Sequence, residues 1–545
     1  MSAGLYYLEN FRHVLETLCE RYADLLAQDE RCFADTFFSL PTESSALLVR
    51  MITRQGTLFR NSRLAYEEIG CTWRAAAPLI EAGFLDPQPA LAWEDLARLA
   101  TRTELSAAFE LPATLRRGRK PQILDHLRTT QDAAQALTGW LRHVGDCVYR
   151  LAVAGLCDRL RIVFFGNFRQ DWSEFVLADL GIHRYERVAV DAGARAFARR
   201  EEIDQFAALY HCRELLHADV PPDEVLAAMP PALSGCAWIE ARRVRLLLFT
   251  AHRFERAQQP SQALQIYLAC EEPRARIRAI RLLDKLDRST EAWELLSSLD
   301  RGLPDESVRQ EIERIRPRLG RKLGITVERA TQAAGWNTFQ IQLLRGREGE
   351  SVERLAAAYL ATPEAPALFV ENALLNSLLG LLCWEAVFAP LPGAFFHEFQ
   401  AAPADLTAPD FCVRRARELA DCLGRLESNE YRACILSAFA AKVGIASPFV
   451  AWGVLTPQLL TLALDCIPAA HLRKYFERIL ADIAANRSGL PDLIQFYPSE
   501  RRYRLIEVKG PGDRLQHNQL RWLRYCVTNG MDVAVCKVSW QEALP

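Results

Sequence analysis

Hydrophobic residues recur three and four positions apart through most of the chain, which is the spacing of amphipathic helices. Residues 1 to about 85 follow this pattern with short polar breaks, and from about 135 to 360 one helical segment follows another. The apolar run at 372–384 is shorter than the ~20 residues that a bilayer crossing needs, so it predicts a buried helix. Further helical stretches follow at about 410–445 and 455–485. The pattern predicts a mainly helical protein up to that point.

Near the C-terminus the period changes to that of strands. LIQFY (493–497) and YRLIEV (503–508) are rich in β-branched and aromatic residues and are separated by a turn-like segment. Gly510 begins a break that ends the second strand, and Asp513 with Gln516 predicts a capping box for the helix that follows. Gly530 ends that helix and MDVAVCKV returns as a third strand. Strand, strand, helix, strand predicts a small α/β domain.

The middle of the chain carries a weak internal repeat. ALQIYLAC (263–270) and EAWELLSSL (291–299) place alanine and aromatic residues at similar positions in successive helical hairpins. Such hairpins stack into solenoids, and the composition resembles a degenerate tetratricopeptide-type repeat.

Composition places limits on the class of protein. The 545 residues imply roughly three to five domains, half the residues are hydrophobic, and the net charge is only −2. Fifteen scattered cysteines show no C-x2-C spacing, so we expect core residues in a reducing compartment. The N-terminus lacks a basic leader region, so we expect an intracellular protein that does not bind membranes. Affinity for nucleic acid must therefore come from local basic patches.

Such patches occur in three places. One lies in the helical run 47–69, one is the basic turn 116–120, and one follows the repeat region. The turn lies between expected helices at 93–109 and 121–129, a layout that resembles a SAP-type DNA-binding unit, and cations at a helix N-terminus favour phosphate. The candidate DNA-binding residues are Arg54, Arg63, Arg116, Arg117, Arg119, Lys120, Arg242, Arg243, Arg274 and Arg276. Interleaved acids leave open that part of this charge only forms surface salt bridges.

The second C-terminal strand carries candidate chemistry. Glu507 and Lys509 share one face, and a hairpin brings Asp492 beside Glu507. Two adjacent carboxylates need a cation or a shared proton, and oxygen ligands suit Mg²⁺ or Mn²⁺. Lys509 is then placed to hold an attacking water and to stabilise charge on phosphate. This is the arrangement PD-x(n)-(D/E)-x-K, although a solvated hairpin with an exposed ion pair has the same spacing.

The segment GLPDLIQFYPSERRYRLIEVKGPGDRLQHNQLRWLRYCVTNGMDVAVCKV resembles the VRR-NUC nuclease domain of the Fanconi-associated nuclease family, within the PD-(D/E)xK superfamily. EVKGPGDRLQHNQ is its most specific part. The resemblance covers nearly the whole chain and implies a mainly α protein with a C-terminal α/β domain. It divides the chain into an N-terminal helical DNA-binding region (1–88), a SAP-like motif (89–132), a tetratricopeptide-like helical region (133–360) and a restriction-endonuclease-like VRR-NUC core (361–545).

The resemblance also implies site residues. Glu371, thirteen residues before Trp384, would supply a third carboxylate, with Glu385 as the competing candidate on the same helix. The metal ligands would be Glu371, Asp492, Glu507 and the Val508 carbonyl, holding one or two Mg²⁺ or Mn²⁺ ions. Residues expected to act in catalysis are Lys509, Glu507, Asp492 and Gln519.

The implied activity is a metal-dependent, structure-selective DNA nuclease: a 5′-flap endonuclease and 5′ to 3′ exonuclease that acts in DNA repair, including repair of interstrand crosslinks. The partner would be branched or flap DNA. The chain begins directly with the core, so we expect no ubiquitin-binding zinc finger, and we expect a bacterial member in the cytoplasm with the nucleoid, or in the nucleus if eukaryotic.

Two other functions remain open from the sequence. One is a helical-repeat scaffold with a degenerate nuclease module, because helical repeats often bind proteins. The other is a junction resolvase with the same core. Self-association on DNA is also left open.

Overall fold

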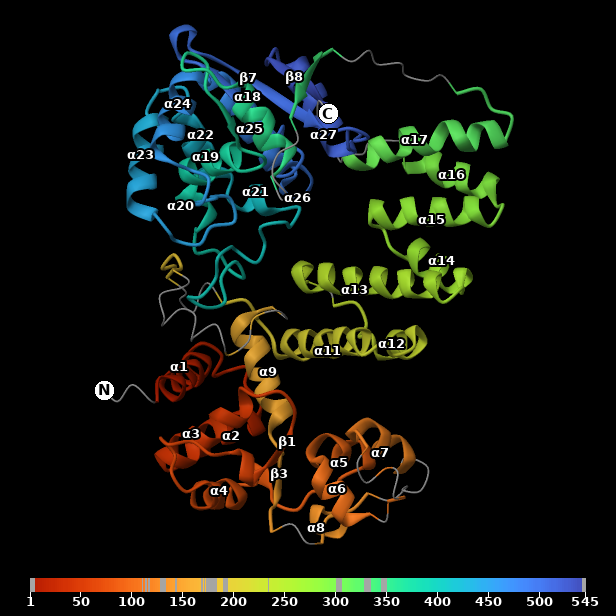
Figure 1. Cartoon of the computed structure of the whole chain (residues 1–545), viewed down its shortest axis with the longest axis vertical. Coiled ribbons are helices and arrows are strands. Elements are labelled where there is room, and N and C mark those ends of the chain that lie inside the picture. The colour runs from red at the N-terminus through yellow and green to blue at the C-terminus, as the bar shows by residue number, and fades with distance from the viewer. Residues whose placement is uncertain are drawn as a thin grey trace. The chain divides into compact units, whose positions relative to one another are not determined.

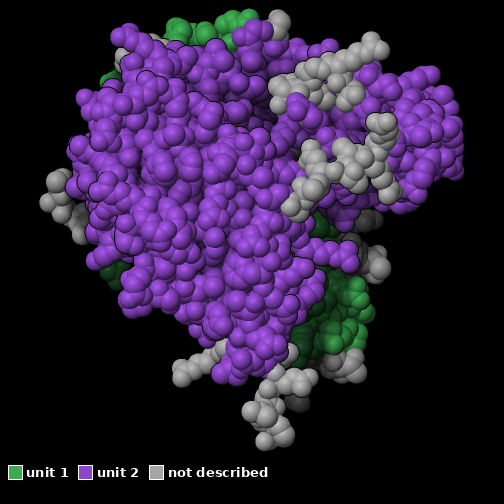
Figure 2. All heavy atoms as spheres, turned by 90° about the horizontal axis from the view of Figure 1, so that it is seen from above, with its two compact units in different colours: residues 1–183, 191–203 green, residues 184–190, 204–545 purple. Residues whose placement is uncertain are grey.

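The computed structural model describes residues 5–109, 111–112, 115, 118–127, 134–142, 145–167, 170, 172, 184–189, 195–233, 235–299, 306–327, 335–344 and 350–541. The chain forms two compact units, residues 1–183 with 191–203, and residues 184–190 with 204–545 (Figure 2). Among the described residues, helices of the length and apolarity needed to cross a bilayer are absent.

The first unit begins with four helices, α1 (Tyr6–Arg21), α2 (Gln28–Ser39), α3 (Thr42–Ile52) and α4 (Thr72–Glu81), and later contributes α9 (Ala154–Phe165). Phe11 contacts Phe37, and Phe33 contacts Phe84, so aromatic rings fill much of its core. A three-stranded sheet of order β1-β3-β2 was not predicted. Its strands, β1 (Leu58–Arg60), β2 (Leu85–Asp86) and β3 (Val148–Leu151), are too short to show a two-residue period.

The SAP-like region contains α5 (Trp93–Leu99), α6 (Arg102–Ala108), α7 (Lys120–Leu127) and α8 (Leu137–Trp140). The single helix predicted over 93–109 is two helices. Ala100 has extended backbone, and Thr101 caps α6 by accepting a hydrogen bond from the Glu104 N–H while the Glu104 carboxylate accepts from the Thr101 N–H. A capping box therefore starts a new helix at a point where the spacing of hydrophobic residues alone predicted that one helix continues.

The second unit holds a stack of helical hairpins (Figure 1). Successive helices pack pairwise, α13 on α14, α14 on α15, α15 on α16 and α16 on α17, as the repeat pattern predicted. Ala263, Tyr267, Ala292 and Leu296 are buried between them. The bounds are α11 (Arg200–His217), α12 (Pro222–Ala228), α13 (Ala237–Arg256), α14 (Pro260–Ala269), α15 (Pro273–Lys285), α16 (Ser289–Leu299) and α17 (Glu306–Lys322).

A five-stranded sheet of order β4-β8-β7-β6-β5 forms the C-terminal α/β domain. β8 lies parallel to β4 and β7, whereas β6 is antiparallel to β5 and β7. Its strands are β4 (Asn337–Leu343), β5 (Ala367–Phe369), β6 (Leu493–Tyr497), β7 (Arg502–Lys509) and β8 (Val533–Trp540). β4 and the helix α18 (Val352–Leu360) come from before residue 361, so the sheet draws on residues from both sides of the boundary expected there.

Helices cover both faces of this sheet. Tyr503 and Leu505 of β7 join a core with α19 (Leu374–Leu382), α24 (Pro457–Cys466), α25 (Ala469–Ala481) and α27 (His517–Thr528). Ile506 and Val508 pack on the other face against α18. The remaining elements are α20 (Trp384–Val387), α21 (Phe411–Arg414), α22 (Ala416–Gly424), α23 (Tyr431–Lys442), α26 (Ile483–Asn486) and the 3-10 turns at Asn61–Arg63 and Pro498–Glu500. The predicted mainly α architecture with a C-terminal α/β domain is confirmed.

Candidate active site at the end of the sheet

Three acidic residues lie near one another at one end of β6 and β7, where β5 also ends. β6 and β7 pair Leu493 with Ile506, so the antiparallel register brings Asp492, one residue before β6, opposite Glu507. On the other side, the Val370 N–H donates to the Asp492 carbonyl at 2.9 Å. Glu371 is the next residue, so strand pairing brings an acid from before α19 to the end of the hairpin that carries Asp492 and Glu507.

Glu507 and Lys509 lie together on one face of β7, as the strand period predicted. Lys509 Nζ is 2.7 Å from Glu507 Oε1. The Glu507 side chain has no solvent exposure, and within the described part of the chain neither of its carboxylate oxygens has a hydrogen bond of good geometry. A buried carboxylate held by one amine alone is incompletely satisfied.

Asp492 is also buried, and its Oδ2 accepts a hydrogen bond from the Val508 N–H at 2.8 Å. Burial raises the pKa of Asp492 to about 6, against the lowering effects of the Val508 N–H and Lys509. Burial raises the pKa of Glu507 to about 8, with the charge of Asp492 adding to the rise and Lys509 opposing it. The fold therefore holds two carboxylates where ionisation is unfavourable unless a cation or a proton joins them.

The donor set suits a hard divalent cation. It consists of buried carboxylate oxygens, and those of Glu507 lack hydrogen-bond partners among the described residues. In the structure, Glu507 contacts Lys509 and Asp492 contacts the Val508 N–H, and no three His, Cys, Asp or Glu side chains of the described residues are already arranged as a metal-binding group. The residues thus fit Mg²⁺ or Mn²⁺ by chemistry and burial.

The structure distinguishes the two candidates for a third acid. The charge of Glu371 raises the pKa of both Asp492 and Glu507. Glu385 is exposed on α20, and it affects the pKa of Cys422 instead. Of these two candidates, Glu371 is therefore the one that lies near the two buried carboxylates.

Gln519 lies in the first turn of α27, where its Oε1 accepts a hydrogen bond from the Gln516 N–H at 2.8 Å. The predicted pairing of Asp513 with Gln516 at this helix start is wrong. Gln516 is itself the N-cap residue, and the Asp513 carboxylate accepts from the Gly510 N–H at 3.0 Å, which closes the turn after β7. The Asp513 carboxylate does not cap the helix because it instead accepts a hydrogen bond from the backbone three residues earlier, in the turn after β7.

Glu353, in the first turn of α18, was not among the predicted site residues. Its charge contributes to the raised pKa of Asp492. Val352 beside it lies against Gly510, which directly follows Lys509: a Cβ added at Gly510 would be 3.8 Å from a Val352 methyl. α18 lies between β4 and β5, and both strands pair with strands far away in the sequence, β8 and β6. No local signal in the sequence predicts that placement.

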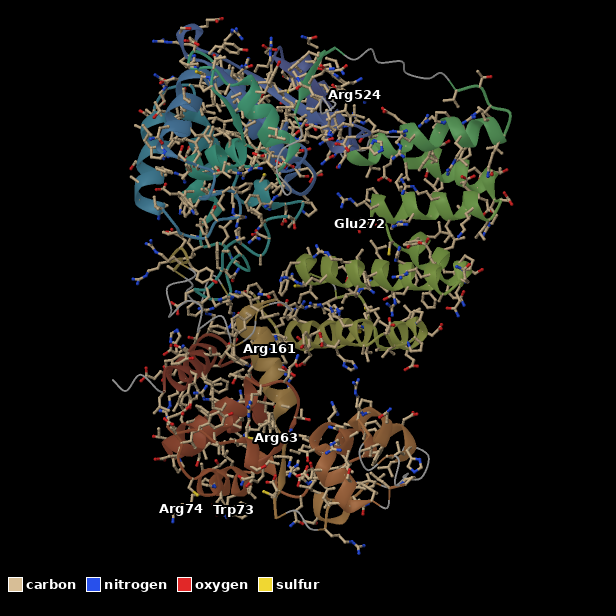
Figure 3. The ribbon with its side chains drawn as sticks, in the orientation of Figure 1. Arg63, Trp73, Arg74, Arg161, Glu272 and Arg524 are labelled. Atoms are coloured by element: carbon tan, nitrogen blue, oxygen red, sulfur yellow. The ribbon has the colours of Figure 1, made fainter. Side chains whose placement is uncertain are left out.

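Three basic candidates of the first unit share a surface. Arg54 Nη1 donates to the Arg63 carbonyl at 3.2 Å, and both side chains are exposed; Figure 3 labels Arg63. Arg63 Nη2 donates to the Leu99 carbonyl at 2.9 Å, so the SAP-like region lies beside Arg63. Burial and the charge of Arg63 lower the pKa of Lys120. Arg119 is exposed beside Lys120, whereas Arg116 and Arg117 lie outside the described residues.

The solenoid candidates differ in their surroundings. Burial lowers the pKa of Arg242 to about 10, and its guanidinium lies 4.7 Å from the Trp238 ring centre. Arg243 forms an ion pair with Glu240 at 2.8 Å. On α15, whose N-cap Glu272 is labelled in Figure 3, Arg274 is exposed and Arg276 half-buried, and neither forms an ion pair within the described part of the chain.

Family models match three parts of the chain. They are described as "FAN1, HTH domain" over residues 5–86, "Fanconi anemia-associated nuclease SAP domain" over 90–140, and "VRR-NUC domain" over 426–540. The expected order of helical region, SAP-like unit and nuclease domain is confirmed.

Whole-chain comparisons agree. The chain is 47% identical to the Fanconi-associated nuclease 1 homolog of Pseudomonas aeruginosa, covering 98% of this chain and 96% of that protein. Human Fanconi-associated nuclease 1 is 24% identical over 98% of this chain and 62% of the human protein. The crystal structure of paFAN1 bound to 2nt 5′-flap DNA with a gap matches with a TM-score of 0.94 and 46% identity, covering 100% of both chains. The chain belongs to the Fanconi-associated nuclease 1 family.

Proposed function

We propose that this chain is a structure-selective DNA nuclease that hydrolyses phosphodiester bonds near the junction of a 5′ flap. One observation carries the proposal: Asp492, Glu507 and Lys509 are gathered at one end of a sheet, with both carboxylates buried. Solved structures of the similar paFAN1 with 1nt and 2nt 5′-flap DNA supply the substrate class. A 5′ to 3′ exonuclease activity, a role in interstrand crosslink repair and a cytoplasmic site of action belong to the same proposal.

Each site residue has a role in this proposal. Asp492 and Glu507, with Glu371 and the Val508 carbonyl, would hold one or two Mg²⁺ or Mn²⁺ ions. When bound, such an ion polarises a phosphate and lowers the pKa of a water molecule. Lys509 Nζ, 2.7 Å from Glu507 Oε1, holds the attacking water or stabilises charge on the phosphate oxygens. Gln519 steadies the water or a backbone phosphate from the first turn of α27.

Selection of branched DNA needs surfaces outside this site. Arg54, Arg63 and Lys120 form one such surface in the first unit, and the exposed Arg274 of α15 forms part of another in the second. Side chains of this kind contact phosphates and fix the position of a duplex without reading its sequence.

The test compares radiolabelled 5′-flap, 3′-flap and four-way substrates, each with Mn²⁺ or EDTA, for the parental chain and for Asp492→Ala. We expect the parental chain to cut the 5′ flap preferentially with Mn²⁺ and not with EDTA. Asp492→Ala should bind the flap with parental affinity and lose more than about 99% of the rate, since removing a charge-stabilising group commonly costs about 10²–10³-fold.

Other outcomes would change the assignment. Preferred cutting of the four-way substrate would favour a junction resolvase. If no substrate is cut at any Mn²⁺ concentration, the solenoid would be a scaffold with an inactive nuclease module. Parental cleavage by Asp492→Ala would remove Asp492 from the site.

A further inference from the structure

The side chain of Asn372 links the loop that carries Glu371 to the loop that carries Asp492. Asn372 directly follows Glu371 and comes just before α19. Its backbone has a φ of 51°, in the left-handed region that asparagine tolerates better than most residues. The chain therefore turns sharply at the residue after the acid.

The Asn372 side chain makes two hydrogen bonds. Its Nδ2 donates to Glu371 Oε1 at 3.2 Å, and its Oδ1 accepts from the Leu490 N–H at 3.1 Å. Leu490 is two residues before Asp492, and Pro491 between them has no N–H to offer. The Asn372 side-chain amide thus connects Glu371 to the segment that leads into β6 and carries Asp492.

The neighbouring backbone holds Asn372 in place. The buried Asn376 donates through Nδ2 to the Asn372 carbonyl at 2.6 Å and to the Arg487 carbonyl at 2.9 Å. On the far side of the acids, the Val370 N–H donates to the Asp492 carbonyl at 2.9 Å. The two loops are therefore tied together at Leu490 and at Asp492 itself.

We propose that Asn372 is a positioning residue that sets the separation of the Glu371 and Asp492 carboxylates and thereby the affinity of the site for a divalent cation. The proposal rests on the proposed metal-dependent function. Groups that orient metal ligands commonly change metal affinity by about 10–100-fold when they are removed. Asn372 itself need not touch the ion, the water or the DNA.

Asn372→Gly tests the proposal, because glycine adopts positive φ without strain and removes both side-chain hydrogen bonds. Titration calorimetry of the DNA-free protein with Mn²⁺ should show an affinity about 10-fold or more below that of the parental chain. Hydrogen exchange should show lost protection of the Leu490 amide. Flap DNA affinity in EDTA should stay unchanged, and cleavage should recover at high Mn²⁺.

Asn429→Gly is the matched control, because Asn429 is exposed and has a φ of 63°. It should keep parental Mn²⁺ affinity. Asn372→Asp keeps the acceptor for Leu490 and should retain protection of that amide, which keeps the test available if the glycine variant does not fold.

A double-mutant cycle isolates the effect on Glu371. In a Glu371→Gln background, Asn372→Gly should reduce Mn²⁺ affinity by a smaller factor than in the parental chain. Parental Mn²⁺ affinity in Asn372→Gly, parental protection of Leu490 in that variant, or lost protection in Asn372→Asp would each overturn the proposal. If the parental chain itself binds no Mn²⁺, the proposed function fails instead.

Discussion

Two buried carboxylates dominate the chemistry of the site at the scale of single residues. Burial raises the pKa of Asp492 to about 6 and that of Glu507 to about 8. A raised pKa means that the folded protein binds the proton more tightly than the unfolded chain does. The destabilising effect of ionisation is therefore absent below the ordinary carboxyl pKa of ~4, and it grows as pH rises toward 8. Without metal, the fold favours the protonated acids.

Glu507→Gln should therefore stabilise the metal-free protein, because the amide removes a charge that burial opposes. At pH 8 in EDTA, we expect the free energy of unfolding to rise by about 2 kcal/mol and the thermal midpoint to rise with it. The gain should shrink toward zero at pH 4.5. Glu364→Gln, at an exposed position, should change neither. A Glu507→Gln protein that melts earlier than the parental chain at pH 8 would contradict this reading of the pKa.

At the scale of elements, the loop before β6 must pass close to the helix after β7. Gly489 has a φ of 85°, and a Cβ added there would be 2.7 Å from Asn518 Cγ in the first turn of α27. Glycine is required here for both conformation and space, and Asp492 follows three residues later. This contact sets how near α27, with Gln519, lies to the acid.

Gly489→Ala should move the loop and destabilise the fold. We expect a loss of about 1–3 kcal/mol in unfolding free energy, since both overpacking and positive φ are unfavourable for alanine. The Mn²⁺ concentration needed for half-maximal cleavage should also rise. Gly512→Ala separates the two causes: its φ is 89° but nothing lies within 4 Å of an added Cβ, so it should lose stability without a change in Mn²⁺ requirement. Equal effects on both properties in the two variants would refute the account.

The elements differ in how far the sequence predicts them. β6, β7, α27 and β8 follow from a two-residue period and from glycines that end β7 and α27, which are local signals, although the residues predicted to cap α27 were wrong. The place of β4 in the sheet depends on β8, nearly two hundred residues later. The sheet of β1, β2 and β3 also depends on non-local pairing, because β3 is distant in sequence from both of its partners. Asp492, Glu507 and Lys509 form a local pattern, whereas Glu371 needed the family resemblance and Glu353 had no signal at all.

For the whole molecule the net charge is only −2, yet each unit carries a basic surface. On the solenoid, Arg243 forms an ion pair with Glu240, and Arg288 forms one with Glu291. Arg274 and Arg276 on α15 form no ion pair with the described residues. Arg274 and Arg276 are thus available for phosphates, whereas Arg281 of the same helix pairs with Glu311 at 2.9 Å. The alternation of acids and bases in the sequence does not distinguish these arginines.

Neutralising these two α15 arginines should weaken DNA binding through charge alone. For Arg274→Gln with Arg276→Gln, we expect the slope of log K against log salt to fall by about 2, with equal losses on flaps of different sequence. Arg243→Gln with Arg288→Gln removes the same charge from residues already in ion pairs and should change the slope much less. Fluorescence anisotropy between 50 and 200 mM salt, a range over which roughly 10³-fold changes occur for such interfaces, makes the comparison. Equal slopes for both double variants would show that α15 does not meet DNA.

We propose that the buried carboxylates of Asp492 and Glu507 hold a divalent cation beside Lys509. Anomalous diffraction from Mn²⁺-soaked crystals of this chain tests it most directly. We predict one strong peak about 2.2 Å from carboxylate oxygens of both residues, with Glu507 released from its contact with Lys509. Saturating Mn²⁺ without a peak at this end of the sheet, or with a peak that only one of the two acids touches, would contradict the account.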